Sequence, residues 1–74
     1  MRIELITRQG CHLCAEAEQL LLAAGVRFQS LDVDADETLF RLYDFRVPLV
    51  LVEGRVVAEG HITGAGLRQA LAGA

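Results

Sequence analysis

The order of the predicted strands and helices narrows the possible folds of this 74-residue chain more than any single motif does. The chain opens with a short apolar run at residues 3–6, which predicts a strand over residues 2–7. Apolar residues then recur with helical spacing between positions 13 and 24, and Gly25 is expected to end this helix in a left-handed conformation. Residues 26–33 predict a second strand. Because a strand, a crossover helix and a second strand form a right-handed unit, these two strands should run parallel.

The second half of the chain predicts a helix, a β-hairpin and a short final helix. Asp34 or Asp36 is expected to cap the first of these helices. Short apolar runs at residues 49–52 and 56–58 flank a glycine-containing connection that suits a hairpin. Thr63 is expected to begin the last helix. The predicted order is therefore βαβαββα, with a parallel start and an antiparallel finish.

This order predicts an α/β fold, in which three helices cover both faces of a four-stranded mixed sheet. A chain of 74 residues can bury one modest core, so residues 1–74 are expected to form a single domain. In such a sheet, a functional site is expected at the carboxyl end of the first strand.

Composition argues against several classes of partner. The net charge is −3 and the arginines are dispersed along the chain, so a nucleic-acid-binding surface is not expected. No apolar run approaches the ~20 residues of a membrane span, and no cationic segment followed by an apolar core precedes the first strand. We therefore expect a cytoplasmic protein that does not bind membranes.

The two cysteines of the chain, Cys11 and Cys14, lie where the first predicted strand gives way to the first predicted helix. A helix N-terminus offers free backbone N–H groups and a partial positive charge, which stabilise a thiolate. Two cysteines three residues apart also differ from the widely spaced framework of a secreted disulfide scaffold. The motif therefore favours redox chemistry over a structural staple.

Two segments together resemble a glutaredoxin, within the thioredoxin fold. They are residues 7–14, with the sequence Thr-Arg-Gln-Gly-Cys-His-Leu-Cys, and Arg46-Val47-Pro48 before the predicted hairpin. The chain is most similar to short bacterial glutaredoxin-like proteins with a Cys-His-Leu-Cys motif. The resemblance implies that Cys11 is the nucleophile, that Cys14 resolves the mixed disulfide, and that the Val47–Pro48 bond is cis and lies against the dithiol. It also places Arg8 where it would support an anionic sulfur or a glutathione carboxylate.

The chain departs from the usual glutaredoxin pattern at several positions. His12 and Leu13 stand where that family usually has proline and an aromatic residue. Arg46 replaces the threonine before Val-Pro, and residues 58–61 read Ala-Glu-Gly-His, without the glycine pair and aspartate that hold glutathione. These departures concern the glutathione-binding residues and leave the dithiol itself intact.

The predicted function is that of a thiol-disulfide oxidoreductase, which reduces protein disulfides or glutathione mixed disulfides through its dithiol. The reaction requires no metal and no organic cofactor, and glutathione or a reductase would return the dithiol to its reduced form. We expect a monomer. A histidine would assist the thiolate, and we favour His12, which lies beside the nucleophile, with His61 as the outside candidate.

Two other classes of function stay open at this point. Small soft-metal carriers for copper or zinc also place Cys-x-x-Cys between a first strand and a first helix, but in the order βαββαβ and with a methionine before the motif. A structural zinc site would need His12 and His61 in addition to both cysteines. The remaining alternative is a thioredoxin-like interaction module without catalysis, which the presence of both sulfurs disfavours.

Overall fold

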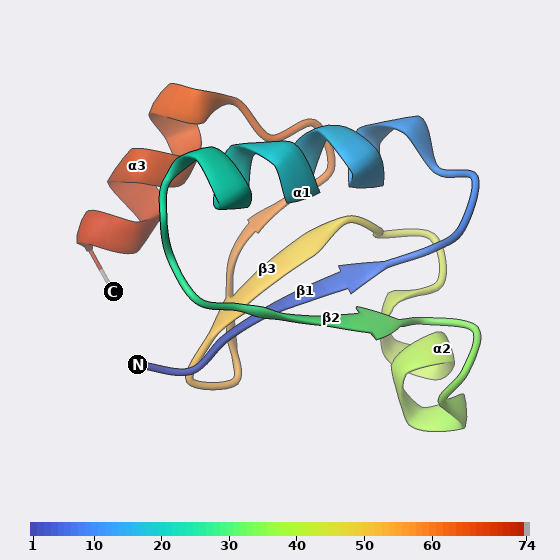
Figure 1. The fold of residues 1–74 in the computed structure, drawn as a ribbon. Helices are drawn as coiled ribbons and strands as arrows, with labels where there is room; N and C mark the ends of the chain where they lie inside the picture. Colours follow the sequence, from blue (N-terminus) through green and yellow to red (C-terminus); the bar gives the residue numbers. More distant parts are fainter. Residues whose placement is uncertain (74) are drawn as a thin grey trace.

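The computed structural model describes residues 1–73 and contains strands and helices in the predicted order βαβαββα (Figure 1). The elements are β1 (Ile3–Thr7), α1 (His12–Ala23), β2 (Gln29–Asp32), α2 (Glu37–Tyr43), β3 (Leu49–Val52), β4 (Arg55–Glu59) and α3 (Gly64–Ala72). The second strand is shorter than the predicted run of residues 26–33. Val26 and Phe28 pack against the core as part of the connection that leads into β2.

The four strands form one mixed sheet in the order β2-β1-β3-β4. β1 pairs with β2 in parallel, and the other two pairs are antiparallel, as predicted from the parallel start and the terminal hairpin. The register sets Thr7 opposite Asp32 and Ile6 opposite Leu49. The carboxyl end of β1 therefore lies between the end of β2 and the beginning of β3.

Side chains of β1 and β3 alternate between two apolar clusters, one on each face of the sheet. Leu5 and Val50 belong to the larger cluster, together with Ala17 and Leu21 of α1 and Leu67 of α3. Ile6, Leu49 and Leu51 point to the other face, where residues of α2 pack against them. In Figure 1, α1 and α3 lie on one side of the sheet and α2 on the other. The predicted covering of both faces is confirmed.

The hairpin turn is tighter than the sequence suggested. Glu53 and Gly54 both have positive φ, 51° and 81°, which is typical of a two-residue type I′ turn, and Arg55 already belongs to β4. Val50 pairs with Ala58 and Leu51 with Val56, so β4 contains one extra residue at this point. This β-bulge has no signature in the sequence.

The helix ends agree with the residues expected there. Gly25 has a φ of 71° and its N–H donates to the carbonyl of Leu22, which closes α1. Of the two candidate caps of α2, Asp36 performs the role, because its side chain accepts a hydrogen bond from the N–H of Leu39. Thr63 caps α3 in the same way. Within residues 1–73, none of the helices combines the length and the hydrophobicity needed to span a bilayer.

Candidate functional site

Cys11 is the N-cap residue of α1. Its backbone is extended, and its Sγ accepts a hydrogen bond from the backbone N–H of Cys14 at 3.2 Å. A turn through Gly10, with a φ of 77°, brings the chain from β1 into this position. Because the first N–H groups of a helix lack partners within the helix, the sulfur of Cys11 supplies one.

Cys14 occupies a different environment, one turn into the helix. Its exposed fraction is 1%, whereas Cys11 is half-buried, and both cysteines are free thiols. Burial raises the pKa of the Cys14 thiol, and the neighbouring Cys11 sulfur acts in the same direction. Cys14 is therefore held as a neutral thiol behind a more accessible partner.

The dithiol lines an open depression of about 360 Å³ between the start of α1 and the end of β2. Cys11 and Cys14 share its lining with Arg8, with Glu18 of α1 and with Asp32 of β2. Glu18 follows Cys14 by one helical turn, so both side chains lie on the same face of α1. Cys11 therefore lies on an open depression of the surface.

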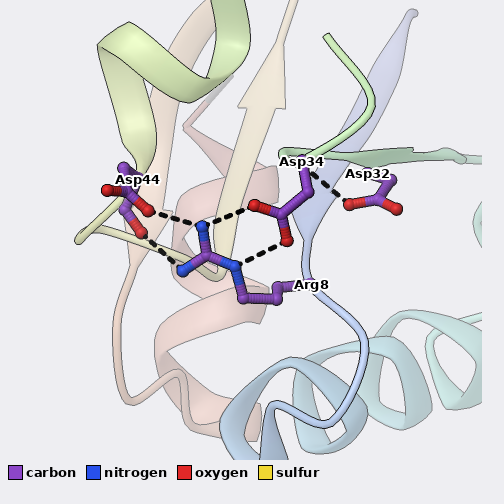
Figure 2. Close-up of polar contacts among 4 residues, drawn as sticks. All are labelled: Arg8, Asp32, Asp34 and Asp44. Carbon is purple, nitrogen blue, oxygen red and sulfur yellow. Dashed lines mark hydrogen bonds and ion pairs between the residues drawn. The ribbon is translucent and has the colours of Figure 1, made fainter. Parts of the chain in front are cut away.

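Arg8 lies three residues before Cys11, but its guanidinium is bound to two carboxylates. Nε and Nη2 donate to the Asp34 carboxylate at 2.8 and 2.9 Å, and Nη2 also donates to the Asp44 carboxylate (Figure 2). Nη1 donates to the Asp44 backbone carbonyl at 3.1 Å. These hydrogen bonds raise the pKa of Arg8 and lower the pKa of Asp34. Arg8 thus joins the dithiol loop to the segments on either side of α2.

The two histidines lie on a second depression, of about 480 Å³, between α1 and the segment that precedes α3. The His12 side chain is 87% exposed, and its Nε2 lies 2.7 Å from the Glu16 carboxylate one turn along α1. His61 lines the same depression from the opposite side. The fold therefore brings both histidines to one surface, next to the beginning of α1.

Val47 and Pro48 lead into β3. The Val47–Pro48 peptide bond is cis, as the resemblance implied. Pro48 is buried, and its carbonyl accepts a hydrogen bond from the N–H of Gly60 at 2.8 Å. Because Leu49 pairs with Ile6, Pro48 lies at the end of the sheet from which β1 leads to the dithiol. Val47 packs against the apolar cluster on the α2 face.

Arg46, which stands before Val-Pro, forms a second two-pronged ion pair. Its Nε and Nη2 donate to the carboxylate of Glu59 at 3.0 and 2.9 Å, and its guanidinium carbon lies 5.5 Å from the centre of the Tyr43 ring. This pairing raises the pKa of Arg46 and lowers the pKa of Glu59.

The sequence alone does not assign several polar residues to this site, and it indicates Asp34 only as a candidate helix cap. Asp34 and Asp44 follow Arg8 by 26 and 36 residues, and no local spacing indicates that they pair with it. Glu18 and Asp32 reach the depression from different elements, so they were also missed. Glu16 could have been found, because it follows His12 by four residues within a predicted helix.

A βαβαββα sheet with Cys-x-x-Cys at the start of its first helix defines a thioredoxin-like protein of the glutaredoxin class. The chain belongs to one family of that class, because the family model described as Glutaredoxin-like domain (DUF836) matches residues 2–72.

Solved structures with the same fold include two that are about one-third identical in sequence. The protein XcR50 from X. campestris, in its X-ray structure, is 32% identical, with a TM-score of 0.87 and 97% of each chain covered. The thioredoxin-like protein BC3987 is 30% identical, with a TM-score of 0.73, covering 92% of this chain and 97% of that chain. A glutaredoxin from Archaeoglobus fulgidus shares the fold at 16% identity, with a TM-score of 0.72 and coverage of 93% and 84%. No match was found among the curated proteins.

Proposed function

We propose that this protein is a thiol-disulfide oxidoreductase in which Cys11 and Cys14 reduce disulfides of proteins or mixed disulfides of glutathione. Membership of the glutaredoxin-like family supports the class of reaction. The cysteine pair at the start of α1 supports the choice of residues.

The observation that carries the proposal is the asymmetry of the two sulfurs. Cys11 caps α1 and lines an open depression, so it lies where a substrate can reach it, at the end of the helix. Cys14 is buried one turn behind it as a neutral thiol. A nucleophile that substrate can reach, with a second thiol within reach of it, is the arrangement that two-step disulfide exchange requires.

In the first step, the Cys11 thiolate attacks one sulfur of the substrate disulfide. A new S–S bond forms between Cys11 and that sulfur, the substrate S–S bond breaks, and the other substrate sulfur leaves as a thiolate. Cys14 then attacks the Cys11 sulfur and gives its proton to the departed thiolate. This attack breaks the mixed disulfide, and the second substrate sulfur leaves as a thiolate. The substrate has gained two electrons and the protein holds a Cys11–Cys14 disulfide.

Glutathione or a disulfide reductase would supply the two electrons that regenerate the dithiol. The scheme uses no metal and no organic cofactor, and it operates in a monomer. Because the dithiol must be kept reduced, we propose the cytoplasm as its compartment and disulfide-containing proteins, not nucleic acid or membranes, as its partners.

The test compares reduction of insulin and of a glutathione mixed disulfide by the reduced protein and by two single variants. Cys14→Ser should accumulate a covalent mixed disulfide at Cys11, visible as a mass increase that dithiothreitol removes. Cys11→Ser should neither reduce the substrate nor form the adduct, since its remaining sulfur is buried. Each variant is the matched control for the other, because both keep one of the two thiols. Adduct formation in Cys11→Ser, or turnover by the Cys11→Ser and wild-type proteins at equal rates, would contradict the proposal.

A further inference from the structure

We infer that the dithiol depression selects disulfides that carry positive charge next to the sulfur atoms. This inference rests on the proposed function and names the class of substrate that the same site prefers. It comes from the charges that line the approach to Cys11.

Glu18 and Asp32 both contribute to the lining of the depression. Each lies on a regular element, Glu18 on α1 and Asp32 at the end of β2, so the backbone fixes their positions relative to the cysteines. Asp32 is further oriented because its Oδ1 accepts the N–H of Asp34 at 2.9 Å (Figure 2). Two acidic residues on fixed elements therefore border the space that a bound disulfide would occupy.

Arg8 does not offset these charges. Among the residues of the described chain that line the depression, it is the only one with a cationic side chain. Its guanidinium is already held by the carboxylates of Asp34 and Asp44. The cluster around Arg8 is therefore net negative before Glu18 and Asp32 are considered.

This distribution has opposite effects on cationic and anionic disulfides. An ammonium or guanidinium group beside the disulfide is attracted by carboxylates and raises the local concentration of substrate, whereas a carboxylate is repelled. Glutathione carries more carboxylates than amines, so it falls in the repelled class. We therefore expect the preferred substrate to be a protein disulfide flanked by lysine or arginine.

The experiment measures single-turnover oxidation of the reduced protein by three small disulfides. Cystamine is cationic, bis(2-hydroxyethyl) disulfide is neutral and 3,3′-dithiodipropionic acid is anionic. Each reaction transfers two electrons from the dithiol to the disulfide and releases two thiols. Because the three disulfides differ in intrinsic reactivity, the quantity compared between proteins is the ratio of the cystamine rate constant to the dithiodipropionate rate constant.

The variant that tests the inference is Glu18→Gln/Asp32→Asn, and its matched control is Glu37→Gln/Glu53→Gln. Both change the net charge equally, but the control positions lie outside the depression. At about 0.01 M salt, we expect the ratio to fall on the order of tenfold in the first variant. In the control it should change less than about twofold.

Salt gives a second measurement that needs no variant. Raising the ionic strength from about 0.01 M to about 1 M shortens the screening length from ~30 Å to ~3 Å, so the wild-type ratio should fall toward that of the double variant. A wild-type ratio that neither salt nor Glu18→Gln/Asp32→Asn lowers would overturn the inference while leaving the proposed function in place. Failure of the wild-type protein to reduce even the neutral disulfide would overturn the proposed function, and this inference with it.

Discussion

Cys11 and Cys14 carry the same side chain, yet the fold gives them different chemistry. The backbone of Cys11 is outside the helix and its sulfur accepts an N–H of the first turn, whereas the pKa of the Cys14 thiol is raised by burial. The sequence alone indicates this difference, because the strand-to-helix boundary falls between residues 7 and 12. It does not indicate which charges surround the sulfurs.

Whether His12 or His61 assists the Cys11 thiolate stays a prediction. A comparison of the two alanine variants tests it. A protonated His12 would place positive charge one residue from the Cys11 sulfur, so His12→Ala should slow alkylation of Cys11 by iodoacetamide about threefold at about pH 6. His61→Ala is the matched control, because His61 lines the same depression from another segment and should leave the rate unchanged. A larger effect from His61→Ala would reverse the assignment. Tight zinc binding that either substitution abolishes would favour metal transport instead.

At the scale of elements, the order of strands and helices could be predicted from periodicity and capping residues. The strand alignment and the ion pairs between distant segments could not. Gly25, Asp36 and Thr63 mark helix ends through local chemistry, which a sequence displays. The hairpin turn and the bulge in β4 depend on how two strands align. β3 is apolar and buried along its whole length, so it offers no alternation of polar and apolar residues that would specify that alignment. The ion pairs of Arg8 and Arg46 join distant segments, so only the folded chain brings their partners together.

These two ion pairs allow a titration with an internal control. Arg8 holds the pKa of Asp34 below its ordinary value of 3.8, and Arg46 holds the pKa of Glu59 below 4.5. In Arg8→Gln, we expect carboxyl-detected NMR to show the Asp34 pKa rising toward 3.8 while that of Glu59 stays low. Arg46→Gln should give the reverse result. Equal shifts of both carboxyls in either variant would show that the pairs are not independent.

The lowered pKa values of Asp34 and Glu59 also determine how the two ion pairs change the free energy of unfolding with pH. A carboxyl whose pKa is lower in the folded state stabilises the fold above its unfolded pKa, and this contribution is lost as the pH falls through the folded pKa. The difference in unfolding free energy between wild type and Arg8→Gln should therefore shrink as the pH falls below 3.8. Since Asp34 is exposed, the difference is expected to be small and to decrease with salt.

At the scale of the whole molecule, the sheet separates two cores of unequal size. The larger one lies under α1 and α3, and the smaller one lies under α2, a helix in which no residue is fully buried. Leu39 and Tyr43 of α2 pack on the sheet, and the segments just before and after the helix bind Arg8 through Asp34 and Asp44. The Arg8 side chain thus connects the dithiol loop to both segments that flank this helix.

Adjacent leucines on α1 test how much of the stability comes from the larger core. Leu21 is 0% exposed within that core, and Leu22 is 57% exposed. We expect Leu21→Ala to lower the free energy of unfolding by about 3 kcal/mol in urea titrations, through lost burial and a residual cavity. Leu22→Ala, the matched control, should change it by less than about 0.5 kcal/mol. Similar losses in the two variants would contradict this assignment of the core.

Because the sulfur of Cys11 caps α1, the helix and the reduction potential of the dithiol belong to one thermodynamic cycle. An N-cap contributes about 1 kcal/mol to stability. When Cys11 forms a disulfide, its sulfur no longer caps the helix. The cap therefore stabilises the reduced protein relative to the oxidised protein, which raises the reduction potential by on the order of 20 mV. A substitution that frays the first turn of α1 would lower the potential by a similar amount. It would thereby make the protein a stronger reductant without altering either sulfur.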